Sequence, residues 1–237
     1  MPSAISELSR GLSLVDSLIT IESSYDDPPR EADLSAVMAL RGGAIVLAVA
    51  NFENYLKERV KEFISFLSAF LVDRRTYNFD RLPDEIRISH YYLTLEFALK
   101  GNRYERIERI QRISEIELAA RDVSGRILDP LAFAQTGGNP NTTTVSSIFK
   151  TLGVRQPFDL LTPLYTTIIG TEVAGTFLQD KLEALIQVRN TVAHTANILN
   201  VGRSDIVEYR DFILNLSSSI DNLLTSHAEA VRVACIR

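Results

Sequence analysis

The sequence contains a single cysteine, Cys235, among 237 residues, so no disulfide bond can form within the chain. Proline is also scarce, with 8 residues, and no segment has the composition of a disordered region. The hydrophobic content of 46% is sufficient for one sizeable core or two modest ones. We therefore expect a single globular domain over residues 1–237.

Long hydrophobic runs are lacking as well. The longest one, residues 63–72, is interrupted by Ser65 and Ser68, whereas a membrane-spanning helix needs roughly 20 apolar residues. The first twenty residues have neither the basic start nor the small-residue cleavage site of a secretion signal. These absences predict a cytoplasmic protein that does not contact a membrane.

Positive charge is in deficit. The chain has 25 lysines and arginines against 30 aspartates and glutamates, which gives a net charge of −5. A protein that grips nucleic acid over a broad surface needs the opposite sign, because its affinity comes from counterions that Lys and Arg displace. Any contact with RNA should therefore be local.

Metal-binding and phosphate-binding patterns are missing too. His90 and His227 have no second histidine or carboxylate at the spacing of a metal site, so we interpret both as structural residues. The glycine-rich stretch 137–141 lacks the Lys-Ser/Thr pair that follows in a phosphate-binding loop, and a turn that starts a helix explains it better. We expect neither a metal nor a cofactor.

What the sequence does have is a helical period along most of its length. Apolar residues recur at intervals of three and four from Ile5 to Ile19, which predicts a first helix. Further helices are expected from about residue 33 or 35 towards 82, and over 84–99, 104–120, 145–152, 172–195 and 204–237. The predicted fold class is all-α, an up-and-down helical bundle with additional helices and an irregular insertion at about 121–170.

The most informative stretch is the hexapeptide at 189–194, RNTVAH, inside the helix expected over 172–195. Arg189 stays charged at physiological pH, and His194 is the side chain type best suited to moving protons there. Asn190 is one helical turn before His194, so its amide can orient the imidazole. This set of groups could cleave a phosphodiester without a metal.

Arg189 falls in the middle of an apolar stripe on this helix, where an unpaired guanidinium would lose several kcal/mol of hydration. It must therefore meet a carboxylate, reach an edge, or face a cavity or a second subunit. Glu53 is one candidate partner. His194 points roughly 140° away from Arg189 on an ideal helix, so a twofold axis could combine residues from two copies of the chain.

A structural interpretation of the same residues stays open. Arg189 and Asn190 could form a hydrogen-bonded set that fixes the register of the bundle, and His194 could favour the negative end of a helix. For Glu53, positioning Arg189 and joining the alternating charges of its own helix are equally possible on spacing alone.

Several stretches together resemble one protein family. The hexapeptide at 189–194 resembles the Arg-polar-x3-His signature of HEPN domains. The segment 48–56, AVANFENYL, and the 138–141 loop with the following stretch 147–153 are similar to the RiboL-PSP type of HEPN protein. The resemblance extends over nearly the whole chain and implies a compact helical bundle.

The resemblance also implies a function. HEPN domains are in many cases metal-independent endoribonucleases, and the positions that match their signature here are Arg189, His194 and the supporting Asn190. It further implies a homodimer with a composite active site, and a toxin or phage-defence role in which an antitoxin or a second HEPN protein is a possible partner.

We thus predict an endoribonuclease that cleaves RNA by attack of the 2′-OH and leaves 2′,3′-cyclic phosphate ends. His194 would transfer the proton and Arg189 would stabilise the charged transition state. Two alternatives stay open: a non-catalytic HEPN-like binding module or partner subunit, and a plain helical scaffold. The sequence identifies neither the RNA target nor an antitoxin.

Overall fold

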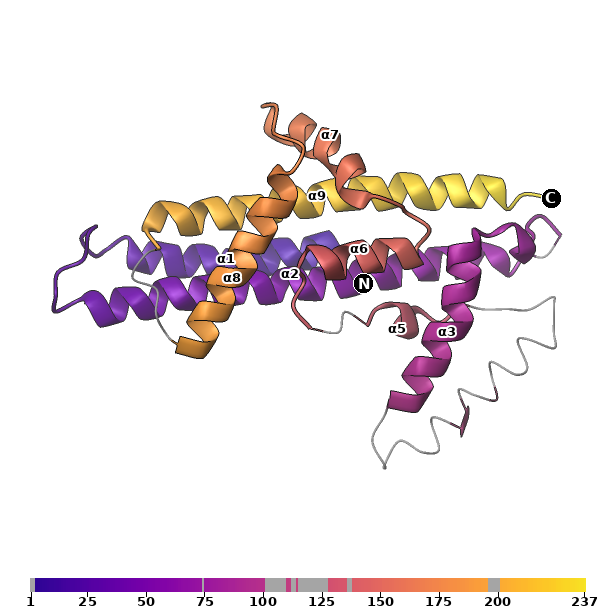
Figure 1. Cartoon of the computed structure of the whole chain (residues 1–237), viewed down its shortest axis with the longest axis horizontal. Coiled ribbons are helices and arrows are strands. Elements are labelled where there is room, and N and C mark those ends of the chain that lie inside the picture. Colours follow the sequence, from indigo (N-terminus) through magenta and orange to yellow (C-terminus); the bar gives the residue numbers. More distant parts are fainter. Residues whose placement is uncertain are drawn as a thin grey trace. The chain divides into compact units, whose positions relative to one another are not determined.

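The computed structural model describes residues 3–73, 75–100, 110–111, 114, 128–135, 138–195 and 201–237. In these residues the chain forms α-helices joined by loops and one short 3-10 turn, η1 (Phe79–Arg81), and no strand, which confirms the all-α prediction. The helices are α1 (Ala4–Glu22), α2 (Leu34–Leu71), α3 (Asp84–Lys100), α5 (Pro130–Phe133), α6 (Thr142–Thr151), α7 (Pro157–Ile169), α8 (Phe177–Thr195) and α9 (Arg203–Ala234) (Figure 1). Most of the helix expected over 104–120 lies outside the described residues.

The chain forms two compact units. Unit 1 consists of residues 1–56, 136–145 and 158–222, and unit 2 consists of residues 57–135, 146–157 and 223–237. Helices α2, α6 and α9 are each divided, with one part in unit 1 and the other part in unit 2. That residues 1–237 form a single domain stays a prediction.

Unit 1 is built on α1 and the first part of α2, which run antiparallel. A Cβ atom added at Gly11 of α1 would lie 2.0 Å from Asn51 Oδ1 of α2, and one added at Gly43 of α2 would lie 3.8 Å from Leu18 Cδ1 of α1. As the residue number increases along α1, the number of the residue that it contacts on α2 decreases. The Asn51 side chain packs against the backbone of α1 at Gly11, because glycine has no Cβ that would occupy this space.

Helix α9 completes this bundle. Arg210 binds both carboxylate oxygens of Asp16 on α1, at 2.9 and 2.8 Å, and the hydroxyl of Tyr55 on α2 donates a 2.7 Å hydrogen bond to the carbonyl of Ser217. Helix α1 thus runs antiparallel to both α2 and α9 in a helical bundle. Apolar side chains of the three helices form its core: Leu8, Leu12, Val15, Ile45, Val49, Phe52, Ile206, Ile213, Leu216 and Ile220.

A buried ion-pair network joins α1, α2 and the start of α9. Glu22 is 1% exposed and Arg41 is 7% exposed. Arg41 Nε donates to Glu22 Oε1 at 2.7 Å, its Nη1 donates to the carbonyl of Val201 at 3.0 Å, and Arg203 pairs with the second oxygen of Glu22. Burial disfavours the charged form of Arg41, but its hydrogen bonds to Glu22 and Asp27 outweigh burial and raise its pKa.

The stretch after Gly153 is more regular than expected. Helix α7 begins at Pro157 and continues through Pro163. Proline is favourable at the first position of a helix, because the N–H that it lacks would have no helical partner there. Pro163 removes one backbone hydrogen bond. One face of α7 is nevertheless buried, through Phe158, Leu161 and Tyr165. Burial of these apolar side chains outweighs the lost bond, so the interpretation of this piece as irregular is wrong.

Unit 2 contains the second part of α2 and the last part of α9, which run parallel to each other. Arg59 Nη2 donates a 2.8 Å hydrogen bond to Thr225 Oγ1. The ring of His227 stacks on Phe63 at 5.7 Å between centroids, and its Nε2 lies 2.8 Å from the carbonyl oxygen of Leu152. His227 therefore has the structural role that the sequence predicts.

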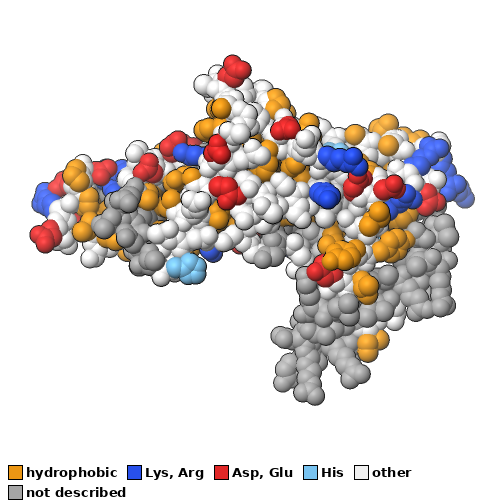
Figure 2. Space-filling view, in the orientation of Figure 1, with side chains coloured by type: hydrophobic (Ala, Val, Ile, Leu, Met, Phe, Trp, Pro, Cys, Tyr) orange, Lys and Arg blue, Asp and Glu red, His pale blue; other side chains and the backbone are white. Residues whose placement is uncertain are grey.

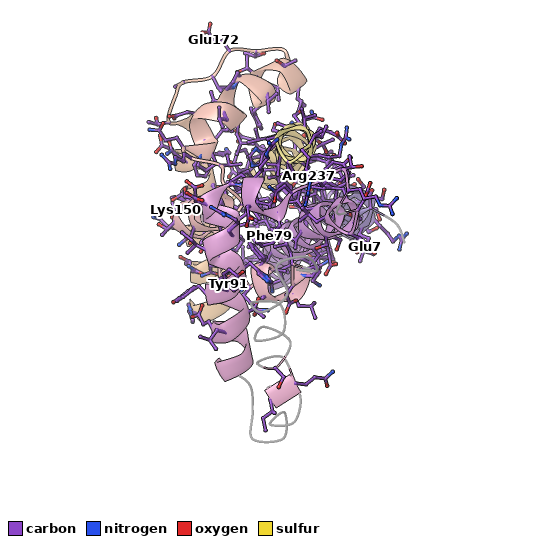
Figure 3. All side chains as sticks on the ribbon, turned by 90° about the vertical axis from the view of Figure 1, so that its right-hand side faces the viewer. Glu7, Phe79, Tyr91, Lys150, Glu172 and Arg237 are labelled. Carbon is purple, nitrogen blue, oxygen red and sulfur yellow. The ribbon has the colours of Figure 1, made fainter. Side chains whose placement is uncertain are left out.

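The C-terminal residues of unit 2 pair with the segment that precedes η1. The Asn78 backbone N–H donates to the carbonyl of Cys235 at 2.8 Å, and that of Arg237 donates to the carbonyl of Thr76 at 2.9 Å. Figure 3 labels Phe79 and Arg237 in this region. These backbone bonds hold the end of the chain in place.

Helix α2 is, in the described part of the chain, the one helix long and apolar enough to cross a membrane by length and composition. The apolar run 63–72, which is too short to cross a membrane, covers only the last part of this long helix and the residue after it. Core helices of soluble proteins pass the same test, and α2 has buried core positions such as Ile45, Phe52 and Phe63. Such burial is consistent with a soluble protein.

Candidate active site

The predicted hexapeptide lies on α8, in unit 1. This helix begins at Phe177 and not at residue 172, because Gly170, with φ of +70°, ends α7 and a short connection follows. Three leucines of the predicted stripe, Leu178, Leu182 and Leu185, are 0% exposed. The helical setting of the hexapeptide and the first half of its apolar stripe are therefore confirmed.

Burial decreases along α8 after Ile186, which is 4% exposed. Arg189 and Val192 are half-buried, and His194 is exposed. The helix thus carries the hexapeptide out of the core of unit 1 to its surface. A phosphodiester could reach side chains in this position, whereas it could not reach the leucines before them.

Arg189 is held by an uncharged acceptor. Its Nη1 donates a 3.1 Å hydrogen bond to Asn190 Oδ1, and its Nε is buried without an acceptor. Within the described residues the guanidinium has no ion pair with a carboxylate. Glu53 lies half-buried on α2, and its supporting role stays a prediction. Because an amide carries no charge, the positive charge of Arg189 remains available to an anion.

The Asn190 amide also binds a loop that sequence reasoning did not include in the site. Its Oδ1 accepts a second hydrogen bond, 3.0 Å long, from Asn139 Nδ2. Asn190 is therefore bonded to Asn139 and Arg189 and not, among the described residues, to His194. These contacts join the Asn190 amide to the guanidinium, and the orientation of the imidazole by Asn190 stays a prediction.

A second contact attaches the same loop to α8. The backbone N–H of Thr142 donates to Glu183 Oε1 at 2.9 Å, and the Thr142 hydroxyl binds the same oxygen. Asn141 Oδ1 accepts from the N–H of Thr144 at 2.9 Å and caps α6, so α6 starts at residue 142 and not at 145. The two contacts join residues that are 51 and 41 positions apart in the chain, so no short spacing in the sequence predicts them.

His194 lies in the last turn of α8, where the helix dipole favours a positive charge. Its side chain is exposed, as a group that exchanges protons with a substrate must be. On an ideal helix it points roughly 140° away from Arg189. A composite site from two copies of the chain stays a prediction.

Comparison with known protein families shows to which family this chain is related. The profile of the RiboL-PSP-HEPN family matches residues 9–226, a range that includes Asn139, Arg189, Asn190 and His194. The chain belongs to the RiboL-PSP-HEPN family. HEPN domains are generally associated with ribonucleases, which indicates a nuclease or RNA-related role. No curated protein and no solved structure matches the chain.

The described residues of this HEPN protein hold no group of three or more His, Cys, Asp and Glu side chains that could bind a metal ion. His90 is 3% exposed on α3, and His227 stacks on Phe63 in unit 2. Neither belongs to the candidate site, as the sequence predicts.

Basic side chains of the HEPN protein gather near the C-terminal end of α9, in unit 2, with acidic side chains among them (Figure 2). Arg155 pairs with Glu85 at 2.6 Å, and Arg232 pairs with Glu229 at 2.8 Å. The Arg155 hydrogen bond lowers the pKa of Glu85, so that carboxylate stays charged. The arginines are thus compensated by neighbours, which differs from the broad basic surface of a general nucleic-acid binder.

Proposed function

We propose that this HEPN protein is a metal-independent endoribonuclease. The observation that carries the proposal is the setting of Arg189 in unit 1, where a guanidinium without a carboxylate partner among the described residues lies five positions before an exposed imidazole on one helix. The family relationship supports the same function at the level of an RNA-related nuclease.

Arg189 stabilises the negative charge that develops on phosphorus-bound oxygens during cleavage. A guanidinium has five N–H donors in a fixed plane, and one Nη1 bond to Asn190 leaves the others for phosphate. A hydrogen bond between two ionised groups is about twice as strong as a neutral one. Donors fixed before the reaction act most strongly in the transition state.

His194 transfers the protons. The imidazole removes the proton from a ribose 2′-OH while the 2′-oxygen attacks phosphorus, and a protonated imidazole gives a proton to the departing 5′-oxygen. The products are a 2′,3′-cyclic phosphate and a 5′-hydroxyl. The diverging directions of Arg189 and His194 support a homodimer in which a second copy supplies the complementary group. DNA lacks the 2′-OH and is not cut.

The cellular role that best fits this chemistry is that of a cytoplasmic toxin or phage-defence effector. The net charge of −5 argues against broad, unselective affinity for RNA. A nuclease of this kind requires restraint, and an antitoxin or a second HEPN protein is the partner that would supply it.

A cleavage assay on total RNA with excess EDTA tests the proposal. We expect the wild-type protein to cleave, and Arg189→Ala and His194→Ala each to lose about 10²-fold or more in rate. Arg155→Ala is the matched control, because this arginine is 83% exposed and lies in unit 2. Cleavage by His194→Ala at the wild-type rate contradicts the proposal. A wild-type chain that is inactive but binds another HEPN protein tightly supports the alternative of a partner subunit.

A further inference from the structure

The 138–141 loop is attached to one side of α8 at two points. Asn139 binds Asn190, and Thr142, just after the loop, binds Glu183. Asn190 and Glu183 are seven residues apart, which places them on the same side of the helix with roughly 10.5 Å between them along its axis. The loop therefore runs antiparallel to α8: it begins beside the hexapeptide and ends beside Glu183.

The backbone of this loop has little freedom. Pro140 is buried, and its ring fixes one backbone torsion angle. The N–H of Asn141 donates a 2.9 Å hydrogen bond to the carbonyl of Asn139, which closes a tight turn around Pro140. Gly138 has φ of +130°, a conformation that side-chain-bearing residues rarely adopt. Asn139 is consequently held in one place before any substrate arrives.

The contact with Asn139 determines which end of the Asn190 amide faces Arg189. An amide has an oxygen that accepts and an NH₂ group that donates. Asn139 Nδ2 and Arg189 Nη1 are both donors, and they share the Asn190 oxygen at 3.0 and 3.1 Å. If the Asn139 donor were removed, the Asn190 amide could rotate and present its NH₂ group to the guanidinium. Two donors facing each other would push Arg189 out of place.

We propose that Asn139 is a positioning residue of the active site, which acts through Asn190 to hold the Arg189 guanidinium against the scissile phosphate. The inference rests on the proposed ribonuclease function for its catalytic part. Its geometric part, the coupling of Asn139 to Arg189, stands on the contacts alone.

A displaced Arg189 stabilises the transition state less but still attracts the RNA through its charge. Asn139→Ala should therefore lower kcat by between about 10- and 100-fold and change KM little. Asn139→Asp should lower kcat further, because a carboxylate cannot donate to Asn190 and attracts Arg189 instead.

A double-mutant cycle with Asn190→Ala tests the route of this effect. If Asn139 acts through Asn190, the double variant has the kcat of Asn190→Ala, with no further loss. The matched control is Asn141→Ala in the same loop, which removes the cap of α6 and should lower Tm with little effect on kcat. Additive losses in kcat for Asn139→Ala and Asn190→Ala would overturn the inference.

A readout that needs no cleavage separates this inference from the proposed function. The Nε–H proton of Arg189 is buried and gives an NMR signal that can be assigned by its loss in Arg189→Lys. We expect this signal to shift in Asn139→Ala and to stay unchanged in Asn141→Ala. An unchanged signal in Asn139→Ala overturns the inference even in an active enzyme. Absence of cleavage by the wild-type chain overturns the proposed function, while a shifted signal would still support the coupling.

Discussion

Arg189 donates a 3.1 Å hydrogen bond to the amide oxygen of the neighbouring residue, Asn190. A guanidinium beside an apolar stripe would be expected to pair with a carboxylate, and a carboxylate would neutralise it. The amide keeps the side chain in place and leaves its charge intact. This choice of acceptor fits a residue that binds an anion better than one that only fixes the packing of helices.

The planar arrangement of N–H donors on Arg189 should matter for cleavage as much as the positive charge does. Arg189→Lys keeps the charge but loses the planar arrangement of donors, so we expect kcat for RNA cleavage to fall by about 10²- to 10³-fold. Tm should change little, because the residue is half-buried at the surface of unit 1. Steady-state kinetics and thermal unfolding provide both values. Full activity in Arg189→Lys would argue that a point charge is sufficient there.

The buried carboxylate of Glu22 should be important for stability. Glu22→Ala leaves the guanidinium groups of Arg41 and Arg203 without their shared partner, which we expect to lower the free energy of unfolding by about 3–5 kcal/mol. Asp26→Asn, which breaks an exposed pair with Arg30, serves as the control and should change it by less than about 1 kcal/mol. Urea unfolding measures both variants, and equal effects would show that the network contributes no more than a surface pair.

The packing of the Asn51 side chain against Gly11 predicts a compensating pair of substitutions. A Cβ at Gly11 would lie 2.0 Å from Asn51 Oδ1, so Gly11→Ala should destabilise the protein by about 1–3 kcal/mol. In an Asn51→Ala background the same change should stabilise it by up to about 1 kcal/mol, because alanine favours a helix over glycine.

Gly43→Ala controls for this helix effect, since its Cβ would meet Leu18 at an ordinary 3.8 Å. Thermal unfolding of the four variants in the Gly11 cycle is the measurement. A Gly11→Ala substitution that destabilises equally with and without the Asn51 side chain would contradict the close contact.

The lone cysteine should be unreactive in the folded protein. Cys235 is 0% exposed, and burial raises the pKa of its thiol, although Arg81 lowers it in part. A raised pKa leaves less thiolate at pH 8, and the thiolate is the reactive form. Iodoacetamide labelling followed by mass spectrometry should be slow in buffer and fast in urea. Rapid labelling of the native chain would show that the C-terminal residues of unit 2 open readily.

Local patterns in the sequence predicted the helices well. The period of three and four residues located α1, α3 and α9 to within a few residues, since amphipathic spacing reflects which face is buried. The family signature also led to Arg189 and His194. Prolines misled the prediction at α7, where Pro163 lies inside the helix and the buried face through Leu161 compensates for it.

The contact of Asn139 with the hexapeptide could not be predicted from local patterns in the sequence. Its partner Asn190 is 51 residues away in the chain, and no spacing rule connects two asparagines over that distance. The resemblance of the 138–141 loop to the family was visible in the sequence, but its link to the hexapeptide required the structure. The start of α6 at Thr142, capped by Asn141, was missed because the threonines that follow are capping residues as well.

The chemical identity of the RNA ends tests the central claim most directly. RNA cut by the wild-type protein in excess EDTA should carry 2′,3′-cyclic phosphates and 5′-hydroxyls, and the same preparation of His194→Ala should produce almost none. Ends with a 5′-phosphate and a 3′-hydroxyl, or cyclic phosphates formed equally fast by His194→Ala, would contradict the account.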